Sequence, residues 1–212
     1  MMSNSRDDIL SKLKNNVAPF PEKSQVENYL PMVKLDKKDT TSLLEFFKSE
    51  AEKLSAQVTI CTSEKEAQKT LFKIIGNKQQ VNCWSSENLP IKNLCETLKD
   101  NGIEITQQES ARFGITGVSA ALAATGSIVL RSGKGRQRTA SLLPEVHLAL
   151  IKKGQIFADF ESWIKDCRHK GIEDFLNPSN IVVISGPSRT ADISMELVLG
   201  MHGPKEQHLI IF

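Results

Sequence analysis

Residues 58–106, VTICTSEKEAQKTLFKIIGNKQQVNCWSSENLPIKNLCETLKDNGIEIT, decide the fold because short apolar runs alternate there with longer helical patterns. In the first helical pattern Ala67, Leu71 and Ile74 recur at helical spacing. The pattern predicts strand 58–61, helix 63–77, strand 80–84, helix 90–101 and strand 103–106. Strands that alternate with helices of about 10–15 residues favour a parallel sheet with helices on both faces.

The chain before this stretch predicts a separate N-terminal region. Residues 6–16 have the pattern of a short amphipathic helix, with Ile9, Leu10 and Leu13 on one side, and residues 17–35 contain three prolines, which predict an extended arm. Asp39 or Thr40 is placed to cap a helix that runs to about Ser55. We therefore expect residues 1–35 to form a helix and arm, and residues 36–212 to form a single α/β domain.

The chain after this stretch continues the alternation less regularly, and residues 101–212 contain 11 of the 12 glycines. It predicts a small-residue helix at 118–125 ending at Gly126, strand 127–130, a basic loop at 131–143, strand 147–151, helix 158–170, strand 181–185, a helix from about Thr190 to Leu199, and strand 208–212. The whole pattern predicts the α/β class, a three-layer arrangement in which helices cover both faces of a mostly parallel sheet.

Composition excludes several classes of function. The 27 basic and 25 acidic residues nearly cancel, which disfavours a nucleic-acid binder. No apolar run approaches the length of a membrane span, and the N-terminus lacks the apolar core of a secretory signal, so a cytoplasmic location is expected. The four cysteines are scattered, and we expect inert thiols in a reducing compartment, with no iron–sulfur cluster or metal in this chain.

A glycine-containing basic loop is the first candidate site. Residues 131–145, RSGKGRQRTASLLPE, place four cations within eight residues, and Gly133 and Gly135 free the backbone to present N–H groups. Such a loop could hold a phosphate or carboxylate, with Arg136 and Arg138 as cationic donors. The alternative is a solvated surface loop with no ligand. The spacing of a Walker-type nucleotide site is absent.

The second candidate is the stretch SGPSRTADISMELVLGMHGP, residues 185–204. A strand ending before a Gly-Pro turn and a capped helix would offer free N–H donors and a partial positive charge to an anion. The residues expected to bind it are Ser185, Gly186, Ser188, Arg189, Thr190 and Asp192. The plain alternative is a well-capped helix with no ligand.

The four histidines give weaker signals. His147, His169, His202 and His208 could each act as a base or metal ligand, but no H-x-x-x-H or H-E-x-x-H spacing occurs. Each is more simply explained as a structural histidine. No G-x-S-x-G motif is present, so a serine hydrolase is excluded.

Several of these motifs together resemble the lactate-utilisation protein C family, which is built on the LUD domain. The resemblance rests on GITGVSAALAATGSIVL, SLLPEVHLALI, ISGPSRTADI and LVLGMHGPKEQHLIIF, in that order, between about residues 110 and 212. It implies a fold similar to the ribose-phosphate isomerase, CoA-transferase and formyltetrahydrofolate cyclo-ligase group. Motif positions whose role the resemblance leaves unknown are Thr125, Gly126, Pro144, Glu196, His202 and Gly203.

The resemblance implies a component of a system that oxidises L-lactate to pyruvate beside iron–sulfur partner proteins, with a small anionic ligand bound at the helix entrance. The alternative is a stand-alone enzyme of the cyclo-ligase or CoA-transferase kind that binds a phosphate-bearing ligand. A third possibility is an assembly factor with an empty cleft. Whether the chain is itself an enzyme, and which residues would be catalytic, stays open.

Overall fold

The computed structural model describes residues 5–15, 35, 39–77, 79–108, 110–171, 177–191 and 197–212. The chain divides into two compact units, residues 1–32 and residues 33–212. The first unit contains α1 (Ser5–Asn15), which confirms the predicted helix. The apolar side chains of Ile9, Leu10 and Leu13 on α1 are 57%, 41% and 62% exposed. The predicted arm at 17–35 lies outside the described residues, apart from Leu35.

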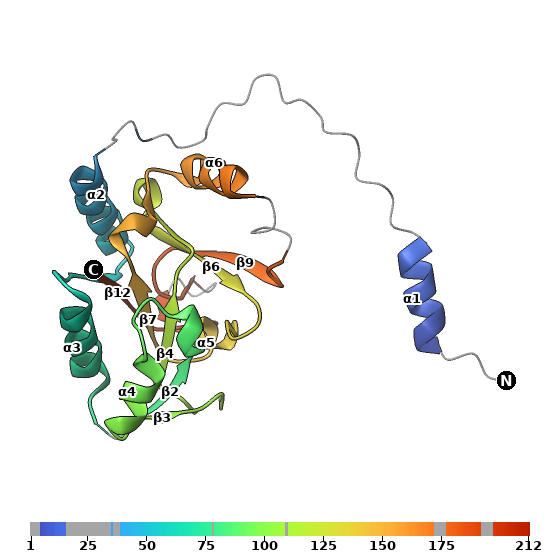
Figure 1. Ribbon diagram of the computed structural model, residues 1–212, viewed down its shortest axis with the longest axis horizontal. Helices are drawn as coiled ribbons and strands as arrows, with labels where there is room; N and C mark the ends of the chain where they lie inside the picture. Colours follow the sequence, from blue (N-terminus) through green and yellow to red (C-terminus); the bar gives the residue numbers. More distant parts are fainter. Residues whose placement is uncertain are drawn as a thin grey trace. The chain divides into compact units, whose positions relative to one another are not determined.

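The second unit is built on a six-stranded sheet in which every strand pair is parallel (Figure 1). This confirms the predicted parallel sheet. In spatial order its strands are β1 (Gln57–Ile60), β12 (Glu206–Ile211), β7 (Val146–Ile151), β4 (Phe113–Gly117), β2 (Gln80–Cys83) and β3 (Glu104–Ile105). The sequence reading missed β4, because its two glycines weaken the apolar run.

Helices cover both faces of this sheet, as β2 shows residue by residue. The Asn82 amide reaches Thr139 of α5 (Thr139–Leu142), whereas the neighbouring Cys83 thiol reaches Cys95 of α4 (Leu94–Asp100). Successive side chains of a strand point to opposite faces, so α5 and α4 lie on opposite sides. Figure 1 shows α3 (Glu64–Ile75) and α5 on opposite sides of β7 and β4.

Capping residues set the starts of the longer helices. Asp39 accepts a hydrogen bond from the Ser42 N–H at the start of α2 (Thr40–Lys53), as predicted. Ser63 does the same for α3 through the Glu66 N–H, and Asp159 for α6 (Phe160–Lys170) through the Ser162 N–H. The predicted helix at 90–101 begins only at Leu94, after Pro90.

A second, four-stranded sheet corrects the predicted helix at 118–125. Its strands, in spatial order, are β8 (Ile156–Phe157), β5 (Ala120–Leu122), β6 (Ser127–Ser132) and β9 (Asn180–Ile184). β5 pairs antiparallel with β6 across a short 3-10 turn, η2 (Ala123–Thr125), that ends at Gly126 with φ of 62°. Small residues at 118–125 fit the crowded backbone of this buried strand pair, which local helix propensity cannot anticipate.

The predicted helix from about Thr190 to Leu199 is also wrong. Residues on either side of 192–196 form antiparallel strands instead, β10 (Arg189–Ala191) and β11 (Leu197–Leu199), with Thr190 opposite Val198. β-branched residues at both of these positions favour the extended backbone that the pairing needs. Among the described residues, no helix therefore begins at Thr190, where the predicted anion site needed one, and Asp192 and Glu196 lie outside the described residues.

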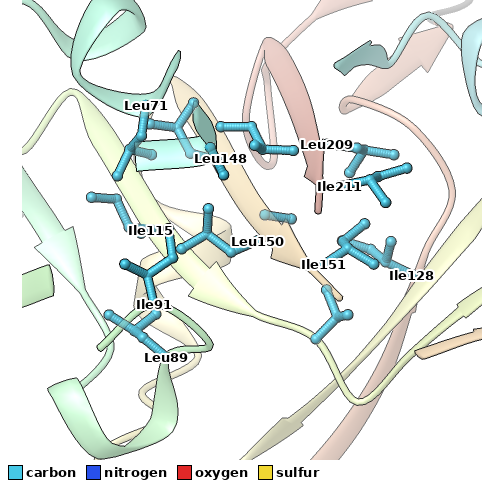
Figure 2. Close-up of a cluster of buried hydrophobic side chains, with 14 of the residues drawn as sticks. Leu71, Leu89, Ile91, Ile115, Ile128, Leu148, Leu150, Ile151, Leu209 and Ile211 are labelled. Carbon is cyan, nitrogen blue, oxygen red and sulfur yellow. The ribbon is translucent and has the colours of Figure 1, made fainter. Parts of the chain in front are cut away.

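One hydrophobic core joins the two sheets and the helices. Figure 2 shows one cluster of side chains that come from the parallel sheet, from α3, from β6 and from the loop that follows β2. Leu148 and Leu150 of β7, Leu71 of α3 and Ile128 of β6 are fully buried. A smaller cluster around Trp163 holds α6 against the second sheet. Within the described residues, no helix combines the length and apolarity needed to cross a bilayer.

Candidate functional site

A pocket of about 380 Å³ lies where β2 and β3 end. Open α/β sheets bind ligands outside the carboxyl ends of their strands, so the position is the expected one for a site. The loop after β2 begins with Trp84 and includes η1 (Ser86–Asn88); it forms one wall and α4 the other. The lining residues are Cys83, Trp84, Ser85, Ser86, Glu87, Cys95, Glu96, Lys99, Ile105, Gln107, Gly135 and Gln137.

The basic glycine-containing loop reaches this pocket through its backbone. The Ser85 N–H and hydroxyl both donate to the Gly135 carbonyl, at 2.9 Å and 3.2 Å. Gly135 has φ of 70°, and a Cβ there would lie 2.1 Å from the Ser85 Oγ. Only glycine fits this close approach without a shift of the loop. The loop therefore contributes a wall to the pocket, as an element fastened to the end of β2.

Gln137 connects the pocket to the interior. The side-chain Nε2 of Gln137 donates to the backbone carbonyl of Cys83 at 2.7 Å. The backbone carbonyl of Gln137 accepts from the Trp84 indole N–H at 3.1 Å. The same amide also donates to the buried Asn82 Oδ1 at 3.3 Å. These bonds hold the loop against the end of β2, so the pocket wall and the adjoining face of the sheet form one hydrogen-bonded network.

The buried face below this loop carries an unusual row of polar side chains. Strand register places Asn82, Gly114, His147 and Gln207 side by side across β2, β4, β7 and β12. Asn82, His147 and Gln207 are at most 2% exposed, in a parallel sheet whose faces are ordinarily apolar. The His147 Nε2 lies 2.9 Å from the Thr116 hydroxyl, and burial lowers the pKa of His147 to about 4. His147 is therefore a neutral, buried imidazole at pH 7.

Two thiols meet at the wall of the pocket. Cys83 ends β2 and Cys95 lies in the first turn of α4, where its Sγ lies 3.5 Å from the Trp84 carbonyl oxygen. The neighbouring Cys83 thiol, with a smaller contribution from Ser86, lowers the pKa of Cys95 to about 7, against the opposing effect of burial. The Cys95 thiol and nearly complete burial raise the pKa of Cys83. The pair thus consists of an ionisable thiol in the pocket and a protonated thiol behind it.

The charge of the pocket differs from the cation cluster that the sequence predicted. Glu87, Glu96 and Lys99 are the charged residues of its lining, and the Ser86 hydroxyl donates to Glu96 at 3.1 Å. Arg136 and Arg138 do not line it. Arg138 is exposed at the start of α5, and Arg136 is half-buried, with an Nε that has no hydrogen-bond partner within the described part of the chain.

Arg189 has a structural partner where the sequence predicted a ligand. Its guanidinium donates to the Leu54 carbonyl at 2.6 Å and to the Ser55 hydroxyl, at the end of α2. The last carbonyls of a helix carry partial negative charge, so an arginine there is favourable. Gly186 docks on the same place: it is buried with φ of 80°, and a Cβ would lie 2.5 Å from the Leu54 carbonyl oxygen. Residues 186–189 therefore fasten α2 to the rest of the unit.

The two motifs of the 185–204 stretch are in direct contact. The Ser188 N–H donates to the Pro204 carbonyl at 2.8 Å, and the Gly200 N–H donates to the Ser188 carbonyl at 3.0 Å. A Cβ on Gly203 would lie 3.3 Å from that of Ser188. Ser185 is exposed, and its hydroxyl lies 2.7 Å from that of Ser127. The ISGPSRTADI and LVLGMHGPKEQHLIIF motifs thus belong to two segments that are hydrogen-bonded to each other.

The remaining motif positions also take packing places. Gly126 and Pro144 are buried, whereas Thr125 and His202 are exposed. Gly126 lies against α2, and Pro144 packs beside Gly114 of β4. The structure does not bring these residues to the pocket, and the sequence reading missed the pocket residues Trp84, Cys95 and Lys99. A signal was present, because Cys83 lies near the end of the predicted strand 80–84 and Cys95 lies in the next predicted helix, 90–101.

Replacing Arg189 by alanine should lower the free energy of unfolding by about 1 kcal/mol, because two hydrogen bonds from an exposed charged group are lost. Urea unfolding of the purified chain measures this. Arg138→Ala removes an exposed arginine with no side-chain hydrogen bond among the described residues, and should leave stability unchanged. Equal stabilities of Arg189→Ala and wild type would contradict the fastening role.

Fold and site together define an open-sheet α/β protein with a pocket at the carboxyl ends of its strands. The chain belongs to the LUD domain family, whose profile matches residues 44–212. The resemblance to the lactate-utilisation protein C family is confirmed. Lactate utilization protein C of Bacillus subtilis is 30% identical over 208 residues, which cover 98% of this chain and 79% of that protein.

Other relatives match shorter stretches. Lactate utilization protein C of a Geobacillus species is 37% identical over 133 residues, covering 61% of this chain and 53% of that protein. The uncharacterized protein YkgG of Escherichia coli is 39% identical over 108 residues, about half of either chain. The crystal structure of a DUF162 family protein from Deinococcus radiodurans covers 82% of this chain and 99% of its own, with a TM-score of 0.59 and 17% identity. At that identity the likeness concerns the fold.

Proposed function

We propose that this chain is a component of a system that oxidises L-lactate to pyruvate. The observation that carries the proposal is the match to Lactate utilization protein C of Bacillus subtilis along 98% of this chain. Lactate oxidation transfers two electrons, and the proposal assigns the electron carriers to iron–sulfur partner proteins. This chain would then bind a small ligand of the system.

We place that ligand in the pocket at the end of β2. Its volume of about 380 Å³ falls in the range of small-molecule sites, about 300–1,000 Å³. The lining combines serine and glutamine side chains with one lysine and two glutamates, which suits a small polar molecule held by several hydrogen bonds. The loop that carries Gly135 and Gln137 is fastened over the strand end, so the wall is formed before a ligand arrives.

The test is L-lactate-dependent dye reduction in an extract of cells that lack this chain and keep its neighbours. Adding the purified full chain should restore the activity. Ser86→Trp should fail to restore it, because the indole fills the pocket, whereas Ser49→Trp, on an exposed position of α2, should restore it fully. Unchanged melting temperatures would show that both variants fold.

Two results would contradict the proposal in different ways. No restoration by the wild-type chain in a competent extract would exclude the role in lactate oxidation. Full restoration by Ser86→Trp would keep that role and exclude the pocket as the ligand site. Melting temperatures measured with lactate, pyruvate and phosphate-bearing ligands then distinguish a component of the lactate system from a stand-alone enzyme. A ligand that binds raises the melting temperature, because at about 100 times its Kd it adds about 2.7 kcal/mol of stability.

A further inference from the structure

The pair of thiols at the pocket wall is a feature that ligand binding alone does not use. Cys83 and Cys95 are twelve positions apart in the sequence, and the β2–α4 connection brings both to the same pocket wall, where the Cys95 Sγ lies 3.5 Å from the carbonyl oxygen of Trp84, the residue after Cys83. Both side chains line the pocket, so a small reagent that enters it meets them. Cys95 is half-buried and Cys83 is 4% exposed, which makes Cys95 the outer member of the pair.

The two thiols differ in chemical role because of their surroundings. The neighbouring Cys83 thiol lowers the pKa of Cys95 to about 7, and Ser86 and Lys99 act in the same direction; burial and the Glu96 carboxylate oppose them. At neutral pH Cys95 is therefore substantially a thiolate, the form that acts as a nucleophile. Cys83 keeps its proton, because the neighbouring Cys95 thiol and burial raise its pKa.

The other two cysteines provide an internal comparison. Cys61 and Cys167 are 0% and 2% exposed, and neither lines the pocket. The Cys61 sulfur lies 3.7 Å from the Thr70 hydroxyl, in the apolar core. Buried thiols in such places react slowly, since reagent and thiolate are both scarce there.

We propose that Cys83 and Cys95 form a redox-active dithiol that a small hydroperoxide converts to an intramolecular disulfide, with Cys95 as the attacking thiol and Cys83 as the resolving thiol. This modification site does not depend on the role in lactate oxidation.

The proposed reaction has two steps. The Cys95 thiolate attacks one peroxide oxygen, so that an S–O bond forms, the O–O bond breaks, and the departing oxygen leaves as water or alcohol after taking a proton. Cys83 then loses its proton and attacks the sulfenic acid sulfur, so that the S–S bond forms and the S–O bond breaks with release of water. Overall, two thiols lose two electrons and the hydroperoxide gains them.

The disulfide would change the pocket. The sulfur atoms must approach to about 2 Å, so the first turn of α4 is drawn toward the end of β2. The negative charge of Cys95 is lost at the same time. Oxidation would therefore narrow one wall of the pocket and remove one of its charges.

The test uses the reduced, purified full chain, exposed to hydrogen peroxide at neutral pH and then analysed by peptide mapping with mass spectrometry. The expected product is a single disulfide that joins the peptides of Cys83 and Cys95. In Cys83→Ser the reaction should stop at a Cys95 sulfenic acid, which dimedone traps. In Cys95→Ser the remaining thiols should stay reduced over the same exposure, and Cys61→Ser should behave as wild type.

A second measurement keeps the test independent of disulfide geometry. The rate of Cys95 alkylation by iodoacetamide should rise with pH with an inflection at about 7, and Cys83→Ala, which leaves no donor at position 83, should move this inflection to higher pH. Equal alkylation rates for Cys95, Cys61 and Cys167 would overturn the proposal, as would oxidation of the folded chain that leaves Cys83 and Cys95 unjoined. Circular dichroism of each variant checks that the fold is retained.

Discussion

Acidification from pH 6.5 to pH 4 should remove about 3 kcal/mol of unfolding free energy through His147 alone. The imidazole has a pKa of about 4 in the folded chain, because it is buried, and about 6.5 in the unfolded chain. Between these values the unfolded chain binds a proton that the folded chain does not, so protons favour unfolding. The contribution is fully present above pH 6.5 and is lost as the pH falls toward 4.

Urea unfolding at a series of pH values measures this loss, and two variants isolate it. His147→Gln lacks the titrating group, so its stability should fall less with acidification than that of wild type. His169→Gln changes an exposed histidine of α6 and should keep the wild-type slope. Parallel curves for wild type and His147→Gln would show that the imidazole is not held neutral by the fold.

Gly126→Ala should destabilise the chain by about 3 kcal/mol, from left-handed backbone strain and overpacking together. Gly126 has φ of 62°, and a Cβ would lie 2.3 Å from the Ala51 nitrogen and 2.5 Å from the Glu50 carbonyl carbon. Both atoms belong to the backbone of α2, so no side chain can turn away to make room. Thermal and urea unfolding report the loss.

Other glycines separate the two causes. Gly102 has φ of 72° with open space around it, so Gly102→Ala should cost only the conformational strain, about 1 kcal/mol. Gly154 has neither a positive φ nor a neighbour within 4 Å, and Gly154→Ala should be close to neutral. If Gly126→Ala cost no more than Gly102→Ala, α2 would not be packed against this turn as the structure describes.

The sequence predicted the fold where local pattern decides it. The strands and helices between β1 and β3 follow from periodicity, and the start of α2 follows from its Asp39 cap, which acts within a few residues. The errors at 118–125 and 190–199 have a different origin. In both stretches pairing with a distant or folded-back strand overrides local helix propensity, as β5 with β6 and β10 with β11 show.

The site was predictable only in outline. Gly135 of the glycine-containing loop lies in the pocket wall, but Arg136 and Arg138 do not line the pocket, and a function for this loop stays a prediction. Arg189 finds its partner 135 positions away, at Leu54, and Cys95 acquires its low pKa from a thiol on another element. Such pairs depend on how the sheet is ordered, which residue spacing does not reveal.

The order of the strands in the parallel sheet also determines how long β1 stays unpaired while the chain is synthesised. β1 lies at an edge, and its neighbour in the sheet is β12. At about 5–20 residues per second, a ribosome needs about 7–30 s to make the chain between the two strands. During that interval the nascent β1 has no strand to pair with, and its backbone groups are open to other chains. We expect this stage, rather than the mature molecule, to be where aggregation begins and where chaperones bind.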